Sequence, residues 1–328
     1  MNIATYLDEP LPLLSLKAAL SRIEGHHFSY SFLKTKCLNL EAGLDGENKV
    51  DSILRNYPFS MEHQVFHDLS LKSSQLFQMD HLFQTSSYSI IFETKNISGK
   101  LRFQENPKQL IRIKANGEMD AFECPAAQLR RKCELLGDWF QNRNINMPIY
   151  GAVILAFPKQ LVELAPKKTK IFFPSQLPSF IRTFPQEKKP LGNLKSIAQE
   201  LAAHHQPYIP EPICQAYDIP RDDILTGVKC QKCGTLGMKK IKRSWACGKC
   251  GHHDQYAHIP TIIEWYLVVG ENMTNKDCRN FLHVDMKTAT RILQSMELLG
   301  TGGKRNRTYQ IDFKRYLQKS TKFDCIED

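Results

Sequence analysis

Apolar and polar residues alternate on both sides of a Ser86-Ser87 pair, over residues 78–96. Alternation with a period of two is typical of strands with one buried face, and a short polar turn between two such runs predicts a hairpin. Pairing outward from the turn places residue 85 opposite 88 and, further along, Asp80 opposite Glu93. The pattern therefore predicts two carboxylates that face each other across neighbouring strands.

Two facing carboxylates repel each other and destabilise a strand pair. A divalent cation bound between them would reverse the sign of that interaction. Lys95 lies two residues beyond Glu93, so its side chain emerges on the same face of the strand, roughly 7 Å along. Two acids and a lysine on one side of a hairpin suit metal-assisted cleavage of phosphodiesters.

The surrounding pattern predicts an α/β domain over residues 41–187. One helix is expected to begin near Glu47, and a second to cover residues 125–140, opened by Pro125 at a favoured first-turn position. The apolar run at residues 149–157 has the length and character of a fully buried strand. This order predicts a mixed α/β fold with a single central sheet flanked by helices.

The rest of the chain divides by composition. A proline-punctuated stretch, residues 206–212, is typical of a linker, and a short amphipathic helix is expected before it. The predicted segments are a helical N-terminal segment (1–40), the α/β domain (41–187), a helix with a Pro-containing linker (188–227), a small cysteine module (228–256), a helical module (257–318) and a tail (319–328).

The overall composition limits the function classes. The chain of 328 residues is 42% hydrophobic and 24% charged, which is typical of a soluble protein with real cores. No stretch approaches the roughly 20 apolar residues of a membrane span, and the first residues lack the basic start of a secretory signal. A net charge of +10 favours a polyanionic partner such as nucleic acid, although a solvated basic surface would give the same value. We expect a cytoplasmic protein with reduced thiols.

Glu47 supplies a third acid. On its expected helix it shares a stripe with Val50 and Leu54, so it points toward the sheet, while Gly43 and Gly46 before it allow a close backbone approach. The simpler interpretation is an acid that complements the helix dipole.

Four motifs together resemble the nuclease-related domain found in many bacterial proteins, a branch of the restriction-endonuclease-like superfamily. The resemblance covers residues 41–184, and the family commonly has Asn where this chain has Cys124. The matching pieces are Glu41-Ala-Gly-Leu-Asp-Gly-Glu47, Gln78-Met-Asp80-His-Leu, Phe92-Glu93-Thr-Lys95-Asn-Ile-Ser-Gly99 and Pro125-Ala-Ala-Gln128.

The resemblance implies a role for each matched residue. Asp80 and Glu93 would bind Mg²⁺ or Mn²⁺, with Glu47 as an additional ligand directly or through water. Lys95 would position the attacking water or stabilise charge on the phosphate, and Gln128 would be an accessory polar contact. Magnesium prefers oxygen ligands and is usually held by one or two carboxylates plus substrate phosphate.

Four cysteines form a regular set, Cys230-x-x-Cys233 and Cys247-x-x-Cys250, each followed by glycine. Two such turns give a tetrahedral four-thiolate zinc site of the zinc-ribbon kind, with no open position, so the zinc would be structural. Redox-active dithiols are the weaker interpretation, because the motifs are paired. The other six cysteines are scattered.

The cysteine module is strongly basic, with no acid between Asp223 and Asp254. Trp245 is expected to be exposed or half-buried on this surface, which would suit contacts with nucleic-acid backbone or single strands. A solvated ribbon face with no partner is the alternative.

The helical module is expected to hold three helices and a basic hairpin, and this order resembles the winged helix-turn-helix fold. The third helix, from about Asp285 to Leu299, would enter the major groove, and the hairpin would contact phosphates; protein binding is the alternative. The residues expected to face DNA are Lys287, Thr288, Thr290, Arg291 and Gln294 on the helix, and Lys304, Arg305 and Arg307 on the wing.

Two functions remain in competition. The first is a Mg²⁺-dependent nuclease that cleaves DNA and is targeted by its C-terminal modules. The second is a catalytically inactive protein that binds nucleic acid through the same modules. A protein-interaction adaptor is a third class, and a homodimer is left open because paired cuts of a duplex require a dimer or two visits.

Overall fold

The computed structural model describes residues 3–7, 9–184, 190–303 and 306–320. The described chain divides into two compact units: residues up to Leu40 together with residues 208–320, and Glu41–Pro207 between them. Among the described residues, no helix combines the length and the apolar character needed to cross a membrane.

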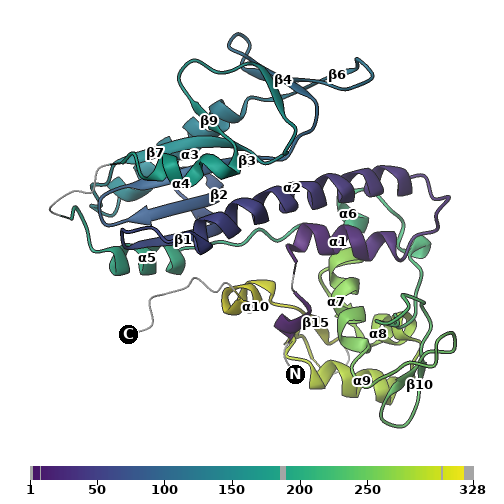
Figure 1. Cartoon of the computed structure of the whole chain (residues 1–328). Helices are drawn as coiled ribbons and strands as arrows, with labels where there is room; N and C mark the ends of the chain where they lie inside the picture. The colour runs from purple at the N-terminus through teal and green to yellow at the C-terminus, as the bar shows by residue number, and fades with distance from the viewer. Residues whose placement is uncertain (1–2, 8, 185–189, 304–305, 321–328) are drawn as a thin grey trace. The chain divides into compact units, whose positions relative to one another are not determined.

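The unit Glu41–Pro207 is built on a five-stranded sheet with the order β1-β2-β3-β7-β9 (Figure 1). The first three strands are antiparallel neighbours, whereas β7 and β9 run parallel to β3. The strands are β1 (His63–Lys72), β2 (Leu76–Thr85), β3 (Ser89–Lys95), β7 (Ile149–Leu155) and β9 (Lys170–Phe172).

The register of the β2–β3 hairpin is the one that the alternation predicts. Gln84 pairs with Ser89 and His81 with Phe92, and the N–H of Thr85 closes the Ser86-Ser87 turn on the carbonyl of Tyr88 at 2.9 Å. The next pair along this register is Asp80 and Glu93. The predicted hairpin is confirmed.

Helices cover both faces of this sheet (Figure 1). One core packs α3 (Pro125–Gln141) and α5 (Leu194–Ala203) against residues such as Ile91 and Val153. The other packs α2 (Tyr30–Asn56) and α4 (Leu177–Ile181) against residues such as Phe92 and Ile154. Because successive strand residues point to opposite faces, Glu93 lies on the α3 face and Phe92 on the α2 face.

Three expectations for this unit are wrong. A second, four-stranded sheet with the order β6-β5-β4-β8 accompanies the central one; its strands are β4 (Lys100–Gln104), β5 (Gln109–Ile113), β6 (Met119–Glu123) and β8 (Leu161–Leu164). Helix α5, the short helix expected before the linker, packs into this core through Ile197 and Leu201, so the unit extends to Pro207 and does not end at residue 187. The run at 149–157 is buried only from Ala152 to Ala156, since Tyr150 is 41% exposed and Phe157 is half-buried.

The helix expected to begin near Glu47 begins at Tyr30 instead. Glycine weakens a helix interior by up to about 1 kcal/mol, but the burial of Val50 and Leu54 beyond it favours continuation. Gly46 is needed for packing: a Cβ there would lie 2.6 Å from Cβ of Asn96 and 3.1 Å from Cβ of Ala156. Gly43 has open space around it.

The other unit combines the N-terminal segment with the C-terminal modules. Helix α1 (Leu11–Leu20) packs against α7 (His258–Val268), a helix whose side chains are nearly all buried, so residues 1–40 are part of this core. Arg22, fully buried, donates from Nε to Oε2 of Glu264 at 2.8 Å and from Nη1 to the carbonyl of Leu225 at 2.9 Å. Lys229 also pairs with Glu264.

The described elements after α7 are three further helices and a small antiparallel sheet with the order β13-β15-β14. They are β13 (Met273–Thr274), α8 (Asn275–Leu282), α9 (Met286–Ser295), β14 (Leu299–Thr301) and β15 (Thr308–Gln310), followed by α10 (Phe313–Ser320). Helix α9 ends four residues earlier than expected, because Leu299 opens the hairpin. Shorter elements are η1 (Ile3–Tyr6), η2 (Pro174–Gln176), α6 (Ile213–Ala216) and η3 (Arg221–Asp223).

We predict that Gly46→Ala destabilises the unit Glu41–Pro207 by about 1–3 kcal/mol, because the added methyl overlaps Asn96 and Ala156. Gly43→Ala is the matched control on the same helix and is expected to stabilise it by about 0.5–1 kcal/mol. Hydrogen exchange of the α2 amides in the full chain measures both changes. Equal effects of the two substitutions would contradict the close approach at Gly46.

Candidate functional site

Two carboxylates lie side by side where β2 and β3 meet. Oδ2 of Asp80 accepts the backbone N–H of Thr94 at 2.7 Å, which fixes the carboxylate against the next strand. Glu93 is 1% exposed. A buried carboxylate without a partner is costly, so the neighbouring groups must compensate the charge.

Two lysines supply that compensation. Nζ of Lys95 donates to Oε1 of Glu93 at 2.8 Å, as its position in the strand predicts. Nζ of Lys132, from α3, donates to Oδ1 of Asp80 at 3.0 Å and also to Oε2 of Glu93, so one ammonium group bridges both acids. The cluster therefore holds two negative and two positive charges.

The sequence analysis missed Lys132. Its signal is its spacing, four residues after Gln128 and therefore on the same face of a helix that begins at Pro125. If Gln128 points toward the sheet, the residue one helical turn later, Lys132, points toward the same part of the sheet.

The pKa values follow from burial and pairing. Burial alone would raise the pKa of Asp80, but the charges of Lys132 and Lys95 and the Thr94 N–H outweigh it, so this pKa is lowered. Burial alone would lower the pKa of Lys132, but Asp80 and Glu93 outweigh it and the pKa is raised. Both groups are thus held in their charged forms.

Gln128 lies beside this cluster without joining it. Its Nε2 donates to Oε2 of Glu123 at 2.9 Å, and Arg131 donates to the other oxygen of Glu123 at 2.7 Å. These bonds, with a smaller contribution from Lys95, lower the pKa of Glu123. No described hydrogen bond joins Gln128 to Asp80 or Glu93.

Glu47 points toward the sheet, as expected from the helix face it shares with Val50 and Leu54. Its partner is a histidine and not the Asp80–Glu93 pair. Its Oε2 lies 3.2 Å from Nε2 of His67 on β1. His67 is paired in register with His81, which lies on the α2 face with Phe92. Within the described part of the chain, no hydrogen bond or ion pair connects Glu47 with Asp80 or Glu93.

Asp68 is a further acid that the sequence analysis did not single out. It has a left-handed backbone (φ 54°), uncommon for a residue other than glycine, and it accepts a hydrogen bond from Gln78. Burial, with smaller contributions from Glu47 and Asp80, raises its pKa to about 6. Nothing in the sequence marks this backbone conformation.

The four regularly spaced cysteines meet as predicted. Their Sγ atoms all lie within 4.8 Å of one another, with Cys230 and Cys250 at 3.7 Å and Cys233 and Cys247 at 3.6 Å. These separations are close to the roughly 3.8 Å expected for thiolates bound tetrahedrally at about 2.3 Å, and much longer than a disulfide. The site fits structural zinc, and hydrogen bonds to Cys233 lower its thiol pKa to about 6.

The expectation for Trp245 is wrong. The ring is fully buried, and its Nε1 donates to Nδ1 of His258 at 3.2 Å. It sits on β11 (Trp245–Ala246), between β10 (Lys239–Lys240) and β12 (His253–Asp254), as the core of the small sheet. It is not available to stack on bases, whereas the basic side chains around it are exposed.

Helix α9 presents part of the predicted basic face. Lys287, Arg291 and Gln294 are exposed. Thr288 bonds to Asp285 at 2.6 Å, and Thr290 bonds to the carbonyl of Met286 and to Asn275, so these hydroxyls hold the helix. On the hairpin Arg307 is exposed, while Lys304 and Arg305 lie outside the described residues.

Residues 42–156 match the family model of the nuclease-related domain. This segment belongs to the nuclease-related domain family. No curated protein and no solved structure matches the chain. The match contains every residue of the Asp80 cluster, and the predicted nuclease-like α/β fold is confirmed.

Asp80 and Glu93 offer the kind of oxygen ligands that a divalent cation needs. Asp80 and Glu93 place oxygens on adjacent strands, and a cationic group already bridges them in the form of the Lys132 ammonium. Carboxylate pairs of this kind suit a hard cation with oxygen ligands. The donor set fits, provided that Lys132 moves aside when a cation binds.

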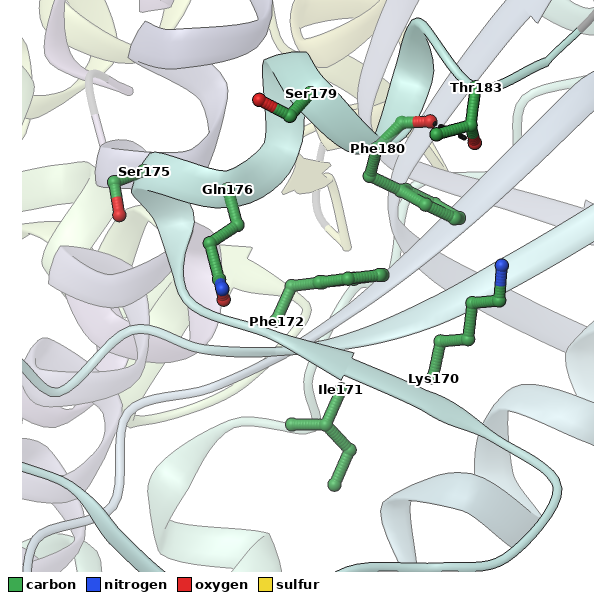
Figure 2. A pocket seen from close by; sticks show the side chains of 8 residues that line it. All are labelled: Lys170, Ile171, Phe172, Ser175, Gln176, Ser179, Phe180 and Thr183. Carbon is green, nitrogen blue, oxygen red and sulfur yellow. Dashed lines mark hydrogen bonds between the residues drawn. The ribbon is translucent and has the colours of Figure 1, made fainter.

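Two pockets lie away from the carboxylates in the same unit. The pocket in Figure 2, of 660 Å³, is lined by β9, η2 and α4, with Phe172 and Phe180 facing each other and Lys170 as its one charged side chain. Another, of 530 Å³, is lined by four basic residues, Lys108, Arg130, Lys167 and Lys168, and by Glu105. Neither pocket contains an acid–lysine cluster like that of the nuclease-related domain.

We predict that Lys132→Met destabilises the nuclease-related domain by about 3 kcal/mol or more, because it leaves buried carboxylate charge without its bridging partner. Arg130→Met is the control: Arg130 is 63% exposed and lies 3.7 Å from Glu134, so its loss is expected to change stability by less than about 0.5 kcal/mol. Hydrogen exchange of the β2 and β3 amides reports both values. Equal protection in the two variants would show that Lys132 does not neutralise the pair.

Proposed function

We propose that this chain is a divalent-metal-dependent nuclease that acts on nucleic acid, with DNA as its target. The observation that carries the proposal is the convergence of Asp80, Glu93 and Lys95 on one face of a hairpin within a nuclease-related domain. The proposed metal is Mg²⁺ or Mn²⁺, held by the two carboxylates.

When bound, such a cation would lower the pKa of a water molecule and stabilise charge on the phosphate. The residues of this chain would do the rest. The pKa of Asp80 is lowered, so its carboxylate stays charged. Hydrogen bonds from Lys95 and Lys132 hold the Glu93 carboxylate in place. Lys95 is 26% exposed, so its ammonium can face substrate phosphate while it remains beside Glu93. Lys132 would hold the carboxylates together until a cation takes its place.

The second unit would bring nucleic acid to this site. The net charge of +10 supports a polyanionic partner, and α9 offers Lys287 and Arg291 at exposed positions. We propose that α7 to β15 form a winged helix-turn-helix module with α9 as its recognition helix and Arg307 on its wing. The zinc ribbon would be structural, and the free cysteines of the described residues suit a cytoplasmic location.

A catalytically inactive nucleic-acid-binding protein is the second candidate. The observation in its favour is that the two acids and two lysines neutralise one another. A closed ion cluster of this kind can be purely structural. The same nucleic-acid-binding modules would then account for the whole function.

We predict that the full chain cleaves plasmid DNA in the presence of Mg²⁺ or Mn²⁺ and not with chelator. Asp80→Asn and Lys95→Ala are expected to lower the rate by at least about 100-fold, because the first weakens a proposed metal ligand and the second removes a positive charge beside the phosphate. Asp120→Asn is the control, since it removes a carboxylate paired with Arg112 on the second sheet.

The same digestion on duplex, single-stranded and structured DNA and RNA defines the substrate. Cleavage that survives both Asp80→Asn and Lys95→Ala would reject the assigned site. A chain that binds these nucleic acids with every residue intact but cleaves none of them would favour the inactive binder.

We predict that Lys287→Glu and Arg291→Glu each weaken DNA binding and reduce the salt dependence of the affinity by about one unit of slope, as expected for a lost phosphate contact. Lys195→Glu, on α5, gives the same change in net charge and is expected to have a smaller effect. Fluorescence anisotropy across a salt series provides the measurement. Equal losses in all three variants would indicate a general charge effect rather than binding by α9.

A further inference from the structure

The α2 face of the central sheet carries a second polar cluster, separate from Asp80 and Glu93. His67 on β1 and His81 on β2 are directly paired across the antiparallel strands. Their rings are stacked, with centroids 4.8 Å apart and planes 4° from parallel. Directly paired residues on one sheet face bring their side chains within contact distance, so both imidazoles can reach a shared ligand.

His81 is the most unusual member of this pair. It is 0% exposed, and neither ring nitrogen has a hydrogen-bond partner among the described residues. The backbone of Glu47 lies near the ring but does not reach hydrogen-bond geometry. A buried polar atom without a partner costs roughly 1–3 kcal/mol, and such atoms are rare in folded proteins.

Helix α2 places acids above the two rings. Glu47 and Asp51 are one turn apart and therefore share a helix face. One ligand atom each from Asp51, His67 and His81 lie within 4.8 Å of one another. Glu47 lies 3.2 Å from Nε2 of His67.

We infer that Asp51, His67 and His81 form a site for a transition-metal ion of the zinc type, with Glu47 orienting the His67 ring. Two imidazole nitrogens and a carboxylate suit Zn²⁺ and similar ions, whereas Mg²⁺ prefers oxygen ligands. Three protein ligands leave the fourth tetrahedral position open. A carboxylate that binds a ligating histidine fixes its ring, which matches the place of Glu47.

Arg55 competes for the same carboxylate. Its Nε donates to both oxygens of Asp51 at 2.9 Å, four residues along the helix. The Arg55 side chain is 29% exposed, and ion pairs of this kind contribute little to stability. Exchange of this partner for a metal ion therefore costs little.

The site is tested with the full chain, its ribbon zinc in place, titrated with Zn²⁺ in the presence of excess Mg²⁺. Metal analysis after removal of unbound ion is expected to give two zinc ions per wild-type chain. Asp51→Asn and His67→Gln are expected to give one. His63→Gln, a histidine on the same strand, is the matched control and is expected to keep two.

Glu47→Gln separates ligation from orientation. It is expected to keep the second ion but to weaken its affinity by about 10–100-fold. Unchanged affinity would overturn the role given to Glu47. A wild-type chain that binds one zinc, or an Asp51→Asn chain that binds two with wild-type affinity, would overturn the site itself. Because Asp51 lies on the helix surface, this variant decides the question even if His67→Gln fails to fold, and no outcome depends on nuclease activity.

Discussion

The register of β2 and β3 brings the carboxylates of Asp80 and Glu93 together inside the domain, and neighbouring lysines neutralise their charge. Asp80 and Glu93 cannot both remain charged on neighbouring strands without compensation. Lys95 comes from the same strand as Glu93, but Lys132 comes from α3, so the helix must lie in one position along the sheet for the cluster to close. Apolar packing of Leu129 and Leu136 fixes the same position. Charge and packing therefore select one placement of α3.

The pleat of the sheet separates two kinds of polar site by a single residue. Asp80 joins the lysines, while its neighbour His81 points to the α2 face and pairs with His67. The first cluster is rich in oxygen ligands and ammonium groups, and the second in imidazole nitrogens. Since the two clusters lie on opposite faces of β2, a change in the register of that strand by one residue would turn Asp80 and His81 to the wrong faces and disrupt both clusters.

Local patterns predicted what depends on local geometry. The turn fixes the hairpin register by counting, so the neighbourhood of Asp80 and Glu93 could be predicted, and the cysteine spacing defines the thiolate site. The errors are long-range. The helix expected to begin near Glu47 begins at Tyr30, because its packing extends the helix backwards, and Trp245 looks exposed in a basic segment until His258 is known to bond to it. Lys132 meets the acids only through tertiary packing.

Buried ion pairs also join the cysteine module to the helical module that follows it. Arg22 and Lys229 both pair with Glu264 of α7, and Lys229 directly precedes Cys230 of the four-cysteine cluster. The ribbon is therefore tied to the helical module by ionic bonds as well as by its chain connection. Burial, followed by the charge of Arg291, lowers the pKa of Lys240, so basic groups of α9 and the ribbon act on one another. A shared anion would relieve the repulsion between these basic groups, which supports the proposal that α9 and the cysteine module contact one phosphate backbone together.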